Sequence, residues 1–171
     1  MSRALLLRSG YVLLSLAVLA LDQVTKEIVS ARLTLYASVP VVPGFFHITL
    51  VTNRGALFGL LHDLADPWRG ALFTVVPAAA IVLVLVFQYR TTLHDPLTQS
   101  GLALVLGGAA GNLADRVRLG YVVDFLDVFV GRHHWPAFNV ADSSICCGVA
   151  LLVVELYRRG RRVADGAAAG G

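Results

Sequence analysis

Residues 107–142 read GGAAGNLADRVRLGYVVDFLDVFVGRHHWPAFNVAD and lie between two apolar stretches. The small residues at 107–111 predict a helix that packs closely against its neighbours. The remainder is unusually polar for so apolar a chain. Its charged and amide residues include Asn112, Asp115, Arg116, Arg118, Asp124, Asp127, Asn139 and Asp142. Carboxylates at the edge of a membrane core are costly to desolvate, so they need partners, water or a chemical role.

The composition is that of a membrane protein. Hydrophobic residues make up 57% of the 171 residues, and the mean hydropathy of +0.72 excludes an ordinary soluble domain. The net charge of +3 comes mainly from arginine, and no basic run is interleaved with aromatic residues, so we expect no nucleic-acid partner. No His or Cys pattern predicts a metal site or a cofactor. Cys146 and Cys147 are adjacent, which disfavours a disulfide between them, and we expect them to be packing residues.

Four apolar stretches predict four transmembrane helices, since a bilayer core of roughly 30 Å requires about 20 apolar residues per span. They cover residues 9–29, 68–87, 98–112 and 142–156. The first stretch, with its basic start, also fits a cleaved signal peptide, but its pattern continues past Asp22, which favours an uncleaved helix. We expect one domain over residues 1–163 and a disordered Gly/Ala-rich tail over residues 164–171.

The segment 32–67 does not have the pattern of a membrane span. Residues 39–44 read VPVVPG and cannot form a helix, because proline lacks a backbone donor and restricts the residue before it. Residues 45–52 are rich in aromatic and β-branched residues and predict an extended strand. Together with the apolar residues up to 61, they predict a small β platform against the lipid headgroups. The expected fold is therefore all-α, with four transmembrane helices and an extracytoplasmic β platform at the membrane interface.

The arginines predict how the chain is oriented. Four spans place both termini on one side, where Arg3 and Arg8 precede the first span and four further arginines follow the last. Since cytoplasmic segments are enriched in Lys and Arg, we expect both termini to be cytoplasmic. Residues 32–67 and 116–141 then face outward, so the unusual polar chemistry lies at the extracytoplasmic surface.

Two carboxylates within the polar stretch have more than one interpretation. Asp142 follows Asn139 with the spacing of a helix capping box, which explains it without any chemical role. Asp124 is flanked by bulky apolar residues, a setting that raises a carboxyl pKa, but it can also be half of an ion pair with Arg116. The eighteen positions between the two aspartates say nothing about their distance in space.

Five segments, in order, resemble the signatures of the bacterial lipoprotein signal peptidases, the signal peptidase II family. They read DQVTK at 22–26, NRGALF at 53–58, GNLADR at 111–116, VVDF at 122–125 and FNVADS at 138–143. The resemblance covers residues 21–145. It implies a membrane aspartic endopeptidase that cleaves diacylglyceryl-modified prolipoproteins on the N-terminal side of the lipidated cysteine. It also implies the bacterial cytoplasmic membrane as the location.

The resemblance also implies roles for individual residues. Asp124 and Asp142 match the catalytic pair, and the substrate-binding or orienting positions are Asn53, Asn112, Arg116 and Asn139. Asp22, Lys26 and Asp115 match positions that support the fold. Two neighbouring carboxyls share a proton, so one can act as base on water while the other polarises the scissile carbonyl. We expect a monomer that contacts membrane lipid and its lipid-modified substrates, without metal or cofactor. An ion or lipid transporter is the alternative, but it calls for ionisable groups at mid-membrane depth and internal repeats.

Overall fold

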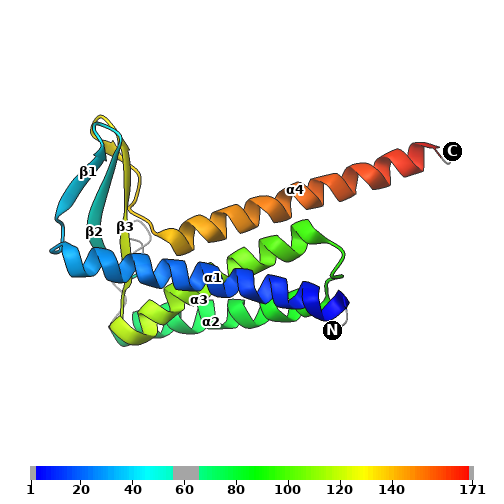
Figure 1. The fold of residues 1–171 in the computed structure, drawn as a ribbon, viewed down its shortest axis with the longest axis horizontal. Coiled ribbons are helices and arrows are strands. Elements are labelled where there is room, and N and C mark those ends of the chain that lie inside the picture. Colours follow the sequence, from blue (N-terminus) through cyan, green and yellow to red (C-terminus); the bar gives the residue numbers. More distant parts are fainter. Residues whose placement is uncertain (1–2, 56–65, 170–171) are drawn as a thin grey trace.

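The computed structural model describes residues 3–55 and 66–169 and contains four helices and one small sheet (Figure 1). The helices are α1 (Arg3–Arg32), α2 (Asp66–Arg90), α3 (Pro96–Leu119) and α4 (Val140–Ala169). The strands are β1 (Ser38–Val42), β2 (Phe46–Asn53), β3 (Val122–Val130) and β4 (His133–His134). The predicted fold class is confirmed. Residues 56–61, which we expected to belong to the platform, lie outside the described residues.

Within the described residues, three helices are long and apolar enough to cross a membrane. They are α1 over Leu5–Arg32, α2 over Leu72–Arg90 and α4 over Val140–Asp165. The 24-residue helix α3 is more polar, since its second half carries Asn112, Asp115 and two arginines. It is also the helix on which each of the other three packs. Of its polar side chains, Asn112 and Asp115 are buried against protein, whereas Arg118 at the end of the helix is exposed.

Small residues let α3 approach its neighbours closely. A Cβ at Gly107 would lie 2.6 Å from the backbone oxygen of Ser15 in α1, and a Cβ at Gly148 in α4 would lie 2.6 Å from that of Gly101. The Ser15 hydroxyl donates a hydrogen bond of 3.0 Å to the backbone oxygen of Ala103. The packing role that the sequence predicts for the stretch 107–111 is confirmed.

The sheet is antiparallel, with the strand order β1-β2-β3-β4. Strand β2 matches the predicted extended segment, whereas β1 and β3 were not predicted as strands. Pro40 is tolerated in β1 because this is an edge strand. Pairing of β2 with β3 sets Val51 opposite Asp124 and Asn53 opposite Val122, which brings the end of β2 to the start of β3.

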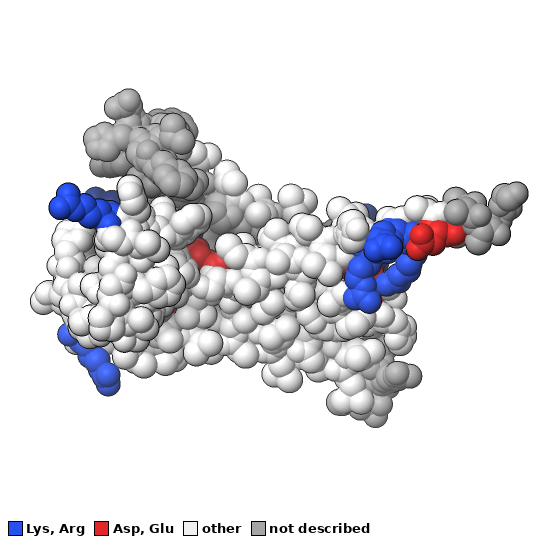
Figure 2. All heavy atoms as spheres, turned by 90° about the horizontal axis from the view of Figure 1, so that it is seen from above, with Lys and Arg blue, Asp and Glu red and all other residues white. Residues whose placement is uncertain are grey.

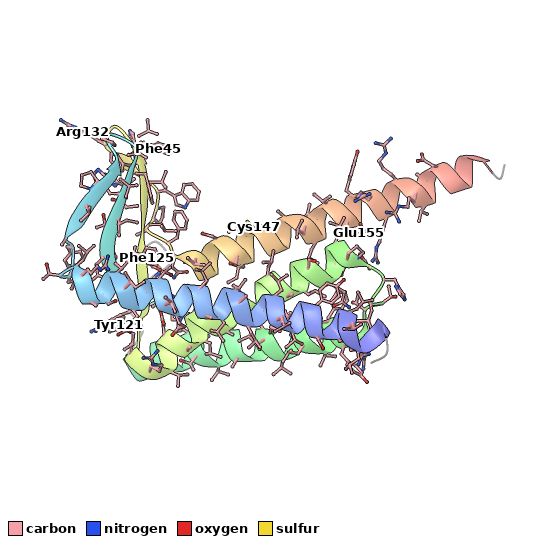
Figure 3. The ribbon with its side chains drawn as sticks, viewed as in Figure 1. Phe45, Tyr121, Phe125, Arg132, Cys147 and Glu155 are labelled. Atoms are coloured by element: carbon pink, nitrogen blue, oxygen red, sulfur yellow. The ribbon has the colours of Figure 1, made fainter. Side chains whose placement is uncertain are left out.

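The sheet stands at one end of the helices, and both termini lie at the other (Figure 1). Phe45 and Arg132 are at the far tip of the sheet (Figure 3). On the face drawn in Figure 2, basic residues gather at the two ends, and the zone between them is nearly free of charge except for a small acidic patch. This charge distribution suits a membrane-spanning bundle with two polar ends.

Helix α4 extends further than the sequence predicted. It continues to Ala169 and so includes residues 164–169, which we expected to belong to a disordered tail; the domain boundary at 163 remains a prediction. Arg159 on α4 forms an ion pair with Asp95, the N-cap of α3, and another with Glu155 at 3.1 Å. Cys146 and Cys147 are free and exposed on α4, so they do not pack within the described protein as expected.

Candidate active site

Asp124 lies in β3 and is only 2% exposed. Its Oδ1 accepts a 2.7 Å hydrogen bond from Asn139 Nδ2, and its Oδ2 accepts a 3.1 Å bond from Asn53 Nδ2. Burial raises the pKa of Asp124 to about 6, against the effect of the Asn53 bond, and the nearby negative charge of Asp142 adds to the rise. The apolar residues on either side of Asp124 in the sequence therefore bury its carboxyl and raise its pKa, as expected. No ion pair joins Asp124 to Arg116 in the described part of the chain, so that interpretation is wrong.

Asp142 lies in the first turn of α4, where it does form the predicted capping box. Asp142 N donates to Asn139 Oδ1 at 2.9 Å, and Asn139 N donates to Asp142 Oδ2 at 3.2 Å. The other carboxylate oxygen, Oδ1, accepts a 2.7 Å bond from Asn112 Nδ2 of α3. Asp142 is thus both a helix cap and part of a network that reaches across to α3.

Asn112 and Asn139 join the two aspartates to each other. Asn139 is fully buried, and its Nδ2 lies within hydrogen-bond distance of Asp124 Oδ1 at 2.7 Å, Asn112 Oδ1 at 3.1 Å and the backbone oxygen of Val123 at 3.2 Å. Asn112 in turn bonds Asp142 through its own Nδ2. The two carboxyls are therefore linked by two hydrogen bonds through Asn139, or by three through Asn139 and Asn112, and α3, β3 and the start of α4 all contribute.

A buried ion cluster supports this network from α1. Lys26 Nζ lies 2.8 Å from Asp22 Oδ2, 2.9 Å from Asp115 Oδ2 and 3.0 Å from Asn112 Oδ1. Asp22 is fully buried and Lys26 is 3% exposed, which agrees with the role in supporting the fold that the resemblance implies for both. The other carboxylate oxygen of Asp22, Oδ1, accepts a 2.9 Å hydrogen bond from the backbone N–H of Ala141. The cluster thus fixes the start of α4.

The same cluster fixes β3 and recruits a residue that sequence reasoning did not single out. Asp115 Oδ2 accepts a 3.1 Å bond from Val123 N, directly before Asp124. Gln23 Nε2 donates to Asp115 Oδ1 at 2.9 Å and to Asp22 Oδ2 at 3.2 Å, and its oxygen accepts from Arg118 at 3.1 Å. Gln23 lies in the segment DQVTK at 22–26, but nothing in the sequence pattern shows that its amide would bond both Asp22 and Asp115.

Arg116 and Asn53 line a small cavity of about 50 Å³, together with Arg54, Phe73 and Tyr121, and Asn53 links this cavity to Asp124 through its hydrogen bond. Arg116 is close enough to both aspartates to interact with them electrostatically. Its guanidinium donates a single hydrogen bond within the described chain, of 3.4 Å, to the backbone oxygen of Asn112. Its other donors have no hydrogen-bond partner among the described residues.

A separate cluster on the sheet involves Asp127. It accepts a 3.2 Å bond from the Thr49 hydroxyl and lies 2.7 Å from Nδ1 of His134, whose ring stacks on Phe129. These contacts give Asp127 a structural role in the sheet. Among the described residues, no group of three His, Cys, Asp or Glu side chains is arranged to hold a metal ion. The expectation of a metal-free, cofactor-free site remains a prediction.

The described site can perform acid–base chemistry. It joins two carboxyls, one of which has a raised pKa, in a single hydrogen-bonded network, and Asn53 of that network lines a cavity together with Arg116. Such a pair can hold one proton between its members, take a proton from water and polarise a carbonyl.

Comparison with known proteins decides the family. The family model described as signal peptidase (SPase) II matches residues 14–158. The chain belongs to the signal peptidase II family. A lipoprotein signal peptidase of Syntrophus aciditrophicus is 48% identical over 142 residues, which cover 83% of this chain and 88% of that protein. One from Geobacter sulfurreducens is 48% identical over 146 residues, covering 85% of this chain and 90% of that protein.

Solved structures of bacterial membrane enzymes, determined by the in meso method, share the fold. One at 2.3 Å resolution has a TM-score of 0.78 and 32% identity and covers 88% of both chains. Another at 1.9 Å has a TM-score of 0.77 and 32% identity and covers 86% of this chain and 92% of that one. The signal peptidase II family is of the aspartic type, so this chain is a multi-pass membrane peptidase that cleaves signal peptides from prolipoproteins. The resemblance stated from the sequence is confirmed.

Proposed function

We propose that Asp124 and Asp142 are the catalytic pair of this peptidase. The observation that carries the proposal is the pair of asparagines, Asn112 and Asn139, that binds both carboxyls within one network. Helix capping uses only Oδ2 of Asp142, whereas Oδ1 accepts a hydrogen bond from Asn112 of α3, which capping does not require. The raised pKa of Asp124 supports the same assignment, because an aspartic pair needs one neutral carboxyl near neutral pH.

Burial suggests how the two carboxyls divide the work. Asp124, 2% exposed, is the carboxyl held neutral, and it donates its proton toward the oxygen of the scissile carbonyl. Asp142, only partly buried, takes a proton from the attacking water, whose oxygen bonds to the carbonyl carbon. When the tetrahedral intermediate collapses, the C–N bond breaks and the leaving amine receives the proton from Asp142. One hydroxyl of the intermediate returns its proton to Asp124 as the C=O bond re-forms. No covalent intermediate forms.

The four residues expected to bind or orient substrate divide into two groups by their contacts. The side-chain donors of Asn53, Asn112 and Asn139 already point at the aspartates, so these residues position the carboxyls. The Asn53 oxygen is also used, since it accepts a 2.9 Å bond from Gly55 N. Arg116 has donors to spare and lines the cavity, so it is the residue we assign to the substrate.

The substrate we propose is a prolipoprotein that already carries a diacylglyceryl group, cleaved on the N-terminal side of the lipidated cysteine. Its support is the family, whose relatives are lipoprotein signal peptidases, together with a site set at one end of an apolar bundle. Burial of each acyl methylene contributes about 0.8 kcal/mol, so a few buried methylenes dominate recognition. A diacylglyceryl-cysteine peptide should therefore be cleaved far faster than the same peptide without lipid. Equal rates for the two peptides would contradict the assignment.

The active site, in our proposal, faces away from the cytoplasm in the bacterial cytoplasmic membrane, with both termini inside. The sheet and the aspartates lie at the end opposite the termini, and exposed arginines on α4 mark the terminal end. A reporter fused after Gly171 should be cytoplasmic, and a cysteine placed at Arg132 should react with an impermeant maleimide added to intact spheroplasts. Labelling at Arg132 only after the membrane is broken would reverse the orientation. We expect the active unit to be a monomer.

Replacing Asp124 tests whether its carboxyl takes part in the reaction. Asp124→Asn keeps the size of the side chain and removes the proton donor, so it should abolish cleavage of the lipidated peptide while the protein still folds. A variant that keeps a substantial share of the wild-type rate would exclude Asp124 from the chemistry.

A further inference from the structure

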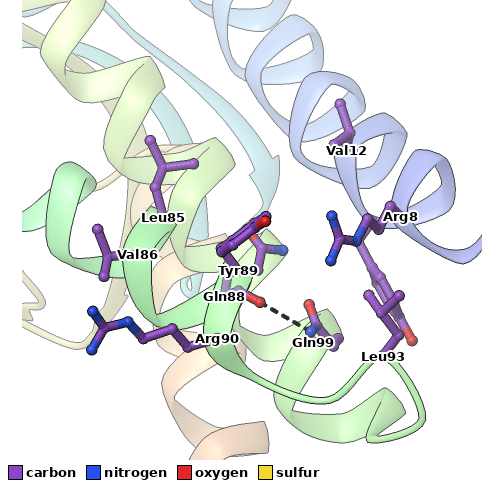
Figure 4. A pocket seen from close by; sticks show the side chains of 10 residues that line it. Arg8, Val12, Leu85, Val86, Gln88, Tyr89, Arg90, Leu93 and Gln99 are labelled. Carbon is purple, nitrogen blue, oxygen red and sulfur yellow. Dashed lines mark hydrogen bonds between the residues drawn. The ribbon is translucent and has the colours of Figure 1, made fainter. Parts of the chain in front are cut away.

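A second, much larger cavity lies far from the aspartates. Its volume is about 640 Å³, within the range of sites that hold small organic ligands, and it is enclosed by α1, the end of α2 and the start of α3 (Figure 4). Arg8 in its wall is fourteen residues before Asp22, which at 1.5 Å per residue is about 21 Å along α1. The cavity therefore lies at the terminal end of the bundle and does not belong to the peptidase site.

The cavity is an open groove with mostly apolar walls. Val12 from α1 and Leu85 and Val86 from α2 line it, with exposures of 56%, 46% and 45%. Each of these helices packs on α3, and Figure 4 shows the gap left between them at this end. In a bilayer such a lipid-facing apolar groove takes up hydrocarbon.

The rim of the groove carries positive charge without carboxylates to neutralise it. Arg8 stacks over the ring of Tyr89, 4.9 Å from its centroid, and Arg90 lines the same cavity. Neither guanidinium has an acidic partner in the described part of the chain. Asp95, the nearby N-cap of α3, is already paired with Arg159 and bonded to Thr98 N. Two unpaired guanidiniums favour an anionic group.

A buried acceptor faces the same cavity. Gln99 is 1% exposed, and its Nε2 donates to the backbone oxygens of Gln88 at 3.2 Å and Thr91 at 3.1 Å. Its Oε1 accepts no hydrogen bond from any described residue, although Gln99 lines the cavity, and in Figure 4 this oxygen lies on the side from which Arg8 enters. A buried polar atom without a partner is costly, so this oxygen calls for a donor from a ligand.

We propose that this groove binds an anionic phospholipid whose headgroup carries hydroxyls. Val12, Leu85 and Val86 hold an acyl chain, Arg8 and Arg90 attract the phosphate, and a headgroup hydroxyl donates to Gln99 Oε1. The lipid comes from the leaflet that borders this end of the bundle. A signal peptide is a poor occupant, because its basic amino-terminal region would meet the two arginines. The bound lipid fills the gap between α1 and α2 and stabilises their packing on α3.

Lipid retention by the purified full chain tests the proposal. The protein in detergent is titrated with phosphatidylglycerol, phosphatidic acid or phosphatidylcholine, and bound lipid is counted by native mass spectrometry. We expect one phosphatidylglycerol to bind at least about tenfold more tightly than phosphatidylcholine, as loss of a charge-assisted contact implies. Equal retention of the two would show a nonspecific lipid layer and overturn the site. Phosphatidic acid that binds as tightly as phosphatidylglycerol would overturn the role of Gln99.

Variants locate the lipid in the groove. Replacing both Arg8 and Arg90 by Gln should weaken phosphatidylglycerol binding at least about tenfold. Arg158→Gln, which removes an exposed arginine from α4 outside the cavity lining, should leave it unchanged. Val12→Trp fills the groove without altering charge and should also expel the lipid. Undiminished binding in the double variant or in Val12→Trp would place the lipid elsewhere.

Discussion

Asn139 and Asp142 bond to each other twice at the start of α4, with each backbone N–H donating to the other side chain, at 3.2 Å and 2.9 Å. This reciprocal cap uses only Oδ2 of Asp142, and Oδ1 receives Asn112 from α3. Capping and catalysis therefore do not compete for the residue. The cap sets the orientation of the carboxyl, and the second oxygen connects it to the network that holds Asp124.

Asp142→Asn separates the two roles. Asparagine has one oxygen, so it can keep the bond from Asn139 N or the one from Asn112 Nδ2, but not both. The free energy of unfolding should fall by only about 1 kcal/mol, as for the weakening of a cap. Cleavage should fall by at least about 100-fold, because the base that takes a proton from water is gone. Cleavage of a lipidated peptide and thermal unfolding in the same detergent measure both effects.

Asp127→Asn provides the control. Asp127 lies in β3, three residues after Asp124, but it bonds Thr49 and His134 rather than the asparagine network. The variant should keep near-wild-type cleavage and lose a similar amount of stability. If Asp142→Asn behaved like Asp127→Asn, Asp142 would be a cap and nothing more.

The pH dependence of cleavage should report the ionisation of Asp124. With a pKa of about 6, set mainly by burial, Asp124 loses its proton as the pH rises through that value, so kcat/KM should fall on the alkaline side. The Asn53 hydrogen bond favours the ionised carboxylate and so lowers the pKa. Asn53→Ala removes that donor, which raises the pKa of Asp124 and should move the alkaline limb of the profile to higher pH.

The profile distinguishes this effect from simple loss of substrate contacts. A residue that only binds substrate changes the height of the kcat/KM profile and leaves the position of its limbs in place. Asn53→Ser, which can still offer a hydroxyl donor, should return the limb part of the way. A profile that falls in height without moving would remove Asn53 from the control of Asp124.

The helices could be predicted from the sequence because they depend on local composition. Apolar length alone located α1, α2 and α4, and the small residues at 107–111 marked the packing face of α3. The ends were less well predicted: α4 continues well beyond residue 156, since its polar Arg-rich and Ala-rich turns are helix formers without being apolar.

The site could not be assembled from the sequence without the family resemblance. Asp124 and Asp142 meet because β3 pairs with β2 and because Asp115 and Asp22 hold the backbone N–H groups of Val123 and Ala141. These are long-range contacts that carry no periodic signal. Asp22 and Lys26 illustrate the point, since their i,i+4 spacing allows the pair but gives no indication of its burial.

Lys26→Met should be severely destabilising. The variant replaces a 3% exposed ammonium by an apolar side chain and leaves Asp22 and Asp115 as buried carboxylates without a cation. Removing one partner of a buried ion pair typically costs about 3–5 kcal/mol. Cleavage should fall as well, since Asn112 loses its 3.0 Å contact with Nζ and with it part of its orientation. Thermal unfolding and cleavage are measured in parallel.

A triple variant that neutralises Lys26, Asp22 and Asp115 together tests whether unpaired charge causes this loss of stability. In Lys26→Met combined with Asp22→Asn and Asp115→Asn, no uncompensated charge remains buried, and the amide oxygens can still accept from Ala141 N and Val123 N. The triple variant should be more stable than Lys26→Met alone. If it were less stable, the loss would come from packing around Lys26 rather than from unpaired charge.

Gly111→Ala tests how tightly α3 and α1 must approach for the site to form. A Cβ at this position would lie 2.5 Å from Asp22 Oδ2, so either the helices separate or Asp22 moves away from Ala141 N. Overpacking of this kind typically costs about 1–3 kcal/mol, and here it also disturbs the start of α4, which carries Asp142. Unfolding temperature and kcat should both fall.

The matched control is Gly10→Ala, which places the same methyl group on the same pair of helices where no atom lies within 4 Å. Because alanine favours a helix over glycine by roughly 0.5–1 kcal/mol, this variant should unfold at the wild-type temperature or slightly above it and cleave normally. Equal behaviour of the two glycine variants would mean that Asp22 and α3 can move apart without loss, and that the ion cluster does not hold the catalytic end in place.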